Sequence, residues 1–137
     1  MIKSTSQPVE STTWEVDPDL QFVATPNTNY EIRGIIFATF HMTVNPRANL
    51  KIRMDGPTGA EIRWGSDYTF KEGESVIIGG APAVFESNAG AMYHSVFSGL
   101  VQTNASGGVV SLSYQKEITT PDDIDIESGS FMVAEML

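Results

Sequence analysis

The segment YEIRGIIFATFHMTV, residues 30–44, decides the fold class of this chain. Its side chains alternate between two faces with the period of two that is typical of a β-strand. One face carries Ile32, Ile36 and Phe40, and the other face carries Ile35 and Phe37. An antiparallel sheet commonly packs one face on the core and leaves the other face polar and solvated. The second apolar face therefore predicts a second buried surface, most simply an interface between subunits.

Two further segments have strand periodicity. Residues 109–116 alternate Val110, Leu112 and Tyr114 with polar residues, which predicts an outer strand with one wet face. Residues 91–103, by contrast, resemble the first segment, because apolar side chains fall on both faces. They are Tyr93, Phe97 and Val101 on one face and Met92, Val96 and Leu100 on the other.

Turn residues divide the rest of the chain. Pro, Gly, Asn and Asp clusters recur at roughly the 8–12-residue spacing of an all-β sandwich or barrel. Weaker strands are expected at residues 13–16, 20–24, 50–55, 60–64, 73–78, 83–87 and 131–136. No long segment has the apolar period of a helix. We therefore predict one antiparallel β-sandwich domain over residues 14–137, preceded by an extended, Ser/Thr-rich arm over residues 1–13.

Composition and charge limit the kind of protein. The chain has 137 residues, no cysteine and a formal net charge of −9, and only 18% of its residues are charged. Because a typical domain has about 25% charged residues, the low fraction favours an oligomer that hides part of its surface. The absence of cysteine excludes disulfides and thiolate metal sites. The negative charge argues against nucleic acid as a partner, and no apolar run approaches the roughly 20 residues of a membrane span.

The charges are distributed in two bands. Five of the eight basic residues lie in residues 47–71, whereas residues 117–137 contain six acids and no Lys or Arg. The two bands could pair between subunits, since complementary potentials fix the register of docking. The simpler interpretation, which we favour, is that they are two solvated surfaces.

No pattern in the sequence predicts catalysis, a cofactor or a metal. His41 and His94 both fall inside predicted strands, and neither has a partner at the spacing of zinc ligands. The acidic segment DDIDIE, residues 122–127, lacks the spacing of a calcium loop. Its acids alternate with isoleucine, which predicts solvated acids along an edge strand. A nucleophile elbow and a phosphate-binding loop are also missing, so we expect that the protein is not an enzyme.

The aromatic residues offer one alternative. A platform on which sugar rings stack could be formed by nine of them, although a small sandwich also needs such side chains to fill its core. They are Trp14, Trp64, Phe22, Tyr30, Phe37, Phe40, Tyr68, Phe70 and Tyr93. A glycan therefore remains a less favoured partner.

Three segments resemble a group of small virion proteins of tailed bacteriophages and prophages. The segment DLQFVATPNTNYEIRGIIF, residues 19–37, matches their pattern of D-x-L-x-F followed by N-T-x-Y-x-(F/I)-R-G-x-I-F. KIRMDGP, residues 51–57, and GSFMVAE, residues 129–135, match two further motifs in the same order. The resemblance therefore extends over most of the chain.

The resemblance implies a β-sandwich protomer of the jelly-roll or TNF-like type that forms a homotrimer. It implies a capsid decoration (cement) protein, made in the host cytoplasm and bound to the major capsid protein on the outer surface of the virion head. The alternative is a tail-fibre or receptor-binding head domain that recognises host glycans. We expect seven residues at the subunit or capsid interface: Trp14, Phe37, His41, Arg53, Arg63, Tyr93 and Phe97.

Overall fold

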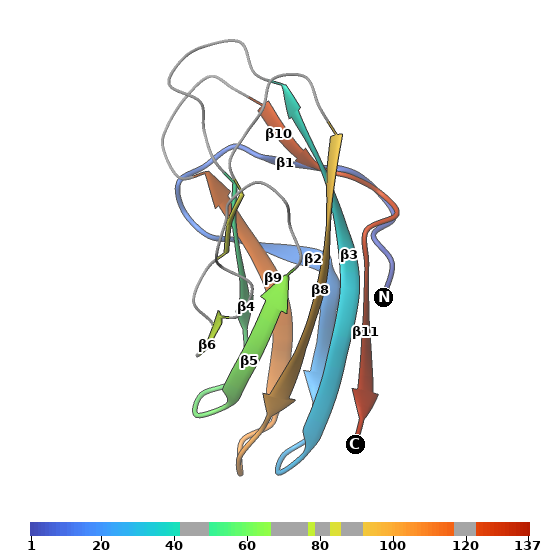
Figure 1. Ribbon diagram of the computed structural model, residues 1–137. Helices are drawn as coiled ribbons and strands as arrows, with labels where there is room; N and C mark the ends of the chain where they lie inside the picture. The colour runs from blue at the N-terminus through green and yellow to red at the C-terminus, as the bar shows by residue number, and fades with distance from the viewer. Residues whose placement is uncertain (42–49, 67–76, 79–82, 86–91, 117–122) are drawn as a thin grey trace.

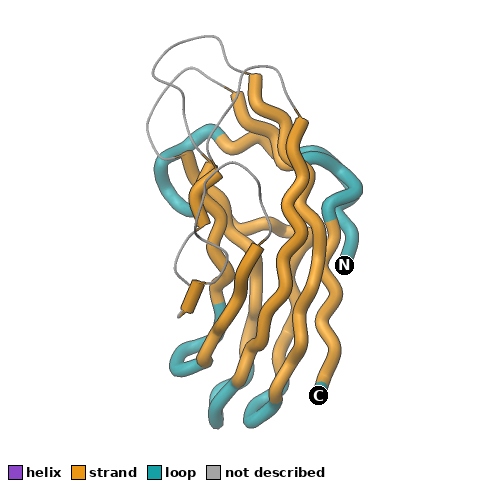
Figure 2. The backbone as a smooth tube through the Cα atoms, in the orientation of Figure 1, coloured by secondary structure: helices purple, strands orange, loops and turns teal. Residues whose placement is uncertain are grey.

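The computed structural model describes residues 1–41, 50–66, 77–78, 83–85, 92–116 and 123–137 (Figure 1). The described residues form strands joined by turns and loops, without a helix (Figure 2), so the prediction of an all-β protein is confirmed. The strands are β1 (Gln7–Val9), β2 (Glu15–Ala24), β3 (Asn29–His41), β4 (Leu50–Asp55), β5 (Glu61–Ser66), β6 (Ile77–Ile78), β7 (Ala83–Phe85), β8 (Met92–Gln102), β9 (Gly108–Lys116), β10 (Asp123–Ile126) and β11 (Phe131–Met136).

The strands form two antiparallel sheets. The seven-stranded sheet has the order β1-β10-β3-β8-β5-β6, with β11 paired to β3 on the same side as β10. The four-stranded sheet has the order β2-β9-β4-β7. The predicted strand over residues 30–44 becomes β3, and its last three residues lie outside the described part of the chain.

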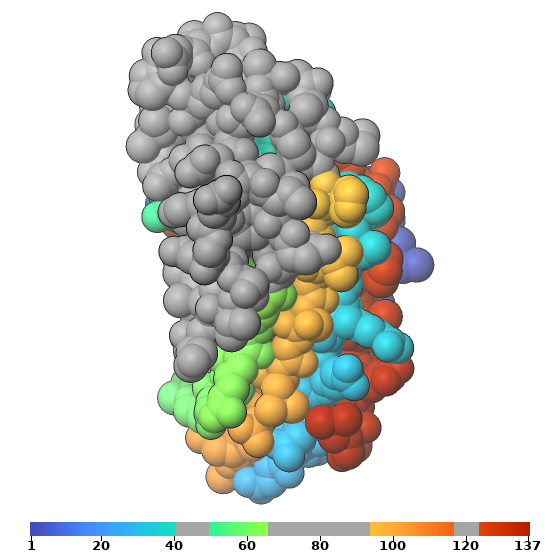
Figure 3. All heavy atoms as spheres, viewed as in Figure 1, coloured from blue at the N-terminus to red at the C-terminus, as the bar shows by residue number. Residues whose placement is uncertain are grey.

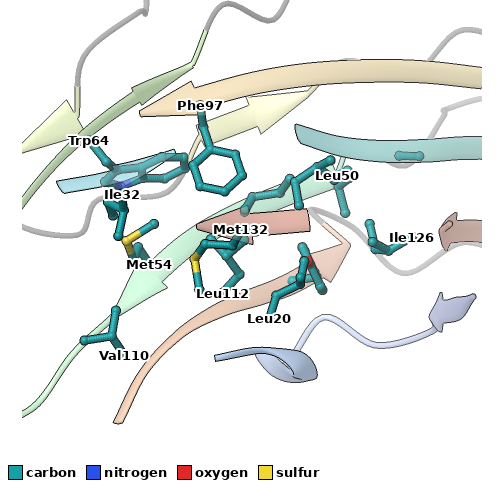
Figure 4. Close-up of a cluster of buried hydrophobic side chains, with 14 of the residues drawn as sticks. Leu20, Ile32, Leu50, Met54, Trp64, Phe97, Val110, Leu112, Ile126 and Met132 are labelled. Atoms are coloured by element: carbon teal, nitrogen blue, oxygen red, sulfur yellow. The ribbon is translucent and has the colours of Figure 1, made fainter. Parts of the chain in front are cut away.

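The core lies between the two sheets. Tyr30, Ile32, Ile36, Ala38 and Phe40 of β3 are all buried, so the first of the two predicted faces is the core face. Side chains of the four-stranded sheet meet them from the other side, as Figure 4 illustrates. They include Leu20, Leu50, Met54, Val110 and Leu112.

One glycine allows the close packing of this core. A Cβ atom at Gly34 would lie 2.1 Å from the carbonyl oxygen of Phe131 and 2.5 Å from Cζ of Phe97. Such distances are far below van der Waals contact, so only glycine fits between β11 and the Phe97 ring. The Arg-Gly step of the 19–37 segment therefore has a packing role.

The separate N-terminal arm that the sequence predicted over residues 1–13 is not confirmed. Ile2 forms a β-bridge with Phe131, and β1 pairs with β10, with Pro8 opposite Asp125. Val9 is 1% exposed. Although the segment is rich in Ser and Thr, main-chain pairing and a few buried side chains attach it to the sheet.

This attachment also corrects the expected position of the acidic strand. Asp125 in β10 and Glu127 directly after it are half-buried, whereas Ile124 and Ile126 are buried, so the alternation of faces is as predicted. However, β10 lies between β1 and β3 and is not at the edge of the sheet. β1 covers the edge that the sequence assigned to these acids.

A buried ion pair holds the N-terminal segment to the other sheet. Lys3 Nζ lies 3.2 Å from Asp17 Oδ1 and 3.1 Å from Asp17 Oδ2, and the two side chains are 1% and 0% exposed. The hydroxyl of Tyr114, on β9, donates a 2.9 Å hydrogen bond to Asp17 Oδ2. Lys3 Nζ also donates to Gln7 Oε1 at 3.0 Å. Both buried charges are therefore paired and hydrogen-bonded, as burial requires.

Asp17 also shapes its own strand. The pairing of β2 with β9 shifts register between Val16 and Gln21. Within this irregular stretch Asp17 Oδ1 accepts hydrogen bonds from the backbone N–H groups of Asp19 (2.9 Å) and Leu20 (3.1 Å). The carboxylate thus satisfies backbone donors that the interrupted ladder leaves unpaired.

The predicted wet face of residues 109–116 is wrong. Ser111 and Ser113 are 5% and 0% exposed, although they point away from the core. β9 is central in its sheet, and Ser113 lies between Val16 of β2 and Arg53 of β4 in the strand register. Residues that lie opposite each other on adjacent strands point to the same face of the sheet. The small serines of β9 are therefore covered by the larger side chains of β2 and β4 beside them.

We predict that Lys3→Met lowers the free energy of unfolding by about 3–5 kcal/mol, because Asp17 would remain buried without its countercharge. Urea denaturation of the purified protein measures this change. Arg33→Met is the matched control, since the Arg33–Glu135 pair is exposed (58% and 55%) and such pairs contribute about 0–1 kcal/mol. Equal losses in the two variants would contradict a special role for the buried pair.

Tyr114 gives a prediction about pH. Burial of the phenol, and secondarily the charge of Asp17 and the hydrogen bond to it, raise the Tyr114 pKa well above its usual value. The Tyr114 phenol therefore ionises at a lower pH in the unfolded chain than in the folded protein. Its contribution to stability is fully present below about pH 10, and the free energy of unfolding falls at higher pH by up to about 1.4 kcal/mol per pH unit. Urea denaturation across this range should show a shallower fall in Tyr114→Phe than in the parent protein. Equal slopes would contradict the prediction.

Candidate functional site

The seven expected interface residues lie on two different sheets. Phe37, His41, Arg63, Tyr93 and Phe97 belong to β3, β5 and β8 of the seven-stranded sheet. The remaining two, Trp14 directly before β2 and Arg53 in β4, accompany the four-stranded sheet. The side chains of His41 and Tyr93 lie outside the described part of the structure, so their expected role stays a prediction. The chain therefore presents two separate candidate surfaces.

The first surface is an apolar row across the outer face of the seven-stranded sheet. Ile2 is opposite Phe131, Phe131 is opposite Ile35, and Ile35 is opposite Val96. Registered side chains on one face approach to about 4.5–5.5 Å between Cβ atoms, so the four residues form a continuous line. Phe37 lies on the same face, two residues along β3 from Ile35. We call these five residues the outer patch.

The outer patch is open to solvent in this chain. Ile2 is 71% exposed and Val96 is 41% exposed, whereas Ile35, Phe37 and Phe131 are half-buried. The Phe37 ring lies 6.3 Å from the ring of His94, which is an exposed neighbour on β8. Figure 3 views this side of the molecule, where β5, β8, β3 and β11 lie side by side. The second apolar face that the sequence predicted is therefore present.

Ion pairs flank the outer patch within the same chain. Arg33 Nη2 lies 3.0 Å from Glu135 Oε1, and Arg63 Nε donates to Glu61 Oε1 at 2.7 Å. Two of the acids on this face are thus balanced locally, although the whole chain has a net charge of −9. An apolar centre with a polar, charged rim has the composition of a protein–protein interface.

Phe97 must be removed from the expected interface set. It is 2% exposed and packs into the core, where its ring lies over Gly34. Successive strand residues point to opposite faces, so Val96 occupies the outer position that was expected of Phe97. The sequence pattern contained both faces of the strand, but it could not tell which face was the core.

The second surface is a cluster around Arg53 on the four-stranded sheet. The Arg53 guanidinium carbon lies 4.2 Å from the centre of the Trp14 ring, and Nε lies 2.8 Å from Asp55 Oδ1. Ser113 Oγ donates a 2.7 Å hydrogen bond to Asp55 Oδ2. A hollow of about 320 Å³ lies beside Arg53 and Asp55. The structure thus brings together Trp14 and Arg53, and adds Asp55 and Ser113, which the sequence analysis did not single out.

The described residues contain no group of three or more His, Asp or Glu side chains placed to hold a metal ion. They also include no helix that is long and apolar enough to cross a membrane. Comparison of the chain with protein-family models, curated proteins and solved structures found no match. The class that fold and surfaces define is therefore an all-β protein with two exposed candidate contact surfaces.

Two phenylalanines give a test of the assignment of faces. Phe97→Ala should lower the free energy of unfolding by about 3–5 kcal/mol, because it leaves a cavity in the core. Phe37→Ala should cost less in a dilute monomer, since that ring is half-buried there. Chemical denaturation of both variants measures the difference. A larger loss for Phe37→Ala would reverse the assignment of core and outer face.

Proposed function

We propose that this chain is a structural protein of a tailed-bacteriophage virion, and specifically a capsid decoration protein that stabilises the head lattice as a trimer. The observation that carries the proposal is the outer patch, an exposed apolar row with a paired ionic rim on an otherwise acidic chain. The resemblance over residues 19–37, 51–57 and 129–135 supports the same class.

We further propose that the sandwich is a jelly roll. From β2 to β9, consecutive strands lie in different sheets except β5 and β6, which pair with each other, and the two orders are β2-β9-β4-β7 and β3-β8-β5-β6. Each four-stranded set interleaves early strands with late ones, which is the arrangement of two Greek keys in a jelly roll. β1, β10 and β11 extend one of these sheets beyond β3. Viral capsid proteins are among the proteins that use this architecture.

A second copy of the chain is the proposed occupant of the outer patch. Two chains with a charge of −9 each repel one another over most of their surfaces. The outer face of the seven-stranded sheet reduces this repulsion, because Arg33 and Arg63 are paired with acids beside the apolar row. The pairing of these two acids lowers the charge that opposes contact between copies at this face.

In this proposal the assembled protein stabilises the capsid by mass action. A protein that binds only the assembled lattice stabilises it by RT ln(1 + [L]/Kd) at each site. Since many equivalent sites occur on one head, the contributions add over the lattice. No chemical step and no cofactor is needed for such a role.

The second candidate is a receptor-binding head domain of the tail that recognises host glycans. The observation that favours it is the Arg53 hollow with its neighbouring Trp14 ring. Antibodies against this chain, applied to intact phage particles and viewed by electron microscopy, distinguish the two. Labelling spread over the head supports decoration, and labelling confined to the tail supports the receptor-binding head.

We predict that the purified protein sediments as a trimer at micromolar concentration and that Val96→Asp shifts it to the monomer. The aspartate would place an unpaired charge in the apolar row, next to Ile35. Val23→Asp is the matched control, because Val23 is 78% exposed on the four-stranded sheet. Analytical ultracentrifugation compares the three proteins.

A parent protein that is monomeric at this concentration would contradict the trimer. A Val96→Asp variant that stays trimeric would contradict the role of the outer patch. Circular dichroism of both variants establishes that the fold is intact, so that dissociation is not confused with unfolding.

A further inference from the structure

We propose that the hollow beside Arg53 and Asp55 is a binding site for the ring of a neutral sugar. This site lies with the four-stranded sheet, whereas the outer patch lies on the seven-stranded sheet. A chain that assembles through the outer patch would keep the Arg53 hollow available. The inference therefore does not rest on the proposed decoration role.

The first argument is that Arg53 is held in place with its terminal nitrogens unused. Its guanidinium is fixed by the Trp14 ring at 4.2 Å and by Asp55 through Nε at 2.8 Å. Arg33 and Arg63 instead direct terminal nitrogens to the carboxylates of Glu135 and Glu61. Within the described residues, the terminal nitrogens of Arg53 have no hydrogen-bond or ion-pair partner. The Arg53 side chain is 33% exposed. Because its guanidinium is already held, little side-chain entropy remains to be lost on binding.

The second argument is that an acceptor stands next to these donors. Asp55 is itself oriented, since Oδ1 contacts Arg53 and Oδ2 accepts the Ser113 hydrogen bond. Each carboxylate oxygen retains capacity for a further hydrogen bond. A hydroxyl group both donates and accepts hydrogen bonds. Neighbouring hydroxyls of a sugar can therefore accept a hydrogen bond from Arg53 and donate one to Asp55. Both side chains are about one-third exposed, at 33% and 36%.

The third argument concerns size and charge. The hollow, of about 320 Å³, extends along the turn between β4 and β5 and is lined there by Gly56, Pro57 and Ala60. This is the low end of the range of small-molecule sites, which suits a single ring better than a long ligand. An anion would be disfavoured, because Asp55 already balances Arg53 and the chain carries −9 overall.

The two tryptophans provide a direct readout of binding. Trp14 contacts Arg53, whereas Trp64 is 3% exposed in the core. In a proton–nitrogen correlation spectrum of the full chain their two indole signals are separate probes, assigned with Trp14→Phe. We expect titration with D-galactose, D-glucose or D-mannose to move the Trp14 signal saturably within about 50 mM, and to leave the Trp64 signal in place.

Matched variants locate the site. Arg53→Gln and Asp55→Asn should each weaken binding of the active sugar by about tenfold or more, because each removes a charged hydrogen-bond partner. Arg63→Gln changes the same residue type on the other sheet and should leave binding unchanged. The spectra themselves report whether each variant is folded.

Three results would overturn the proposal. They are the absence of a saturable shift with all three sugars, an unchanged affinity in both Arg53→Gln and Asp55→Asn, and tighter binding of galacturonic acid than of galactose. The last result would indicate an anion site. None of these results bears on oligomerisation through the outer patch, so the two proposals fail independently.

Discussion

The buried pair of Lys3 and Asp17 is the constraint on which the ends of the structure depend. Two charges without access to water are tolerated only when they are close together and fully hydrogen-bonded, and Tyr114 and two backbone N–H groups complete that requirement. Lys3 belongs to the N-terminal segment, which includes the edge strand β1 of the seven-stranded sheet. Asp17 belongs to β2 of the four-stranded sheet. The pair therefore joins the two sheets, places β1 over the edge of β10, and positions Ile2 at the end of the outer patch.

The two sheets differ in what they offer to a partner. The seven-stranded sheet has an apolar row with ionic sides, whereas the four-stranded sheet has a charged and hydroxyl-bearing cluster around Arg53. Burial of apolar surface is non-directional, so the first surface suits extensive contact with another protein. Hydrogen bonds with fixed geometry are directional, so the second suits recognition of a small polar molecule. One protomer can accommodate both without competition.

Much of the fold was predictable, because strand periodicity is a local property. Residues 30–44 revealed both apolar faces of β3, and the alternation of Val110, Leu112 and Tyr114 identified an inward face. The errors concern residues that are far apart in sequence. Nothing near Lys3 indicates that Asp17 and Tyr114 will surround it, and nothing near Ser113 indicates that β4 covers it. Trp14 and Arg53 were both selected as interface residues, but their contact with each other depends on strand order, which no local pattern encodes.

The pairing of Ile2 with Phe131 has a consequence for biosynthesis. Residues 2–9 are made before their partner strands β10 and β11, which follow the other strands of the described residues. Contacts of such long sequence separation form slowly, so β3 carries an unpaired edge until β10 and β11 have been made. The contact of Lys3 with Asp17 spans only a short loop and can form early. It would keep the N-terminal segment beside its final position while the strands that complete the sheet are still being made.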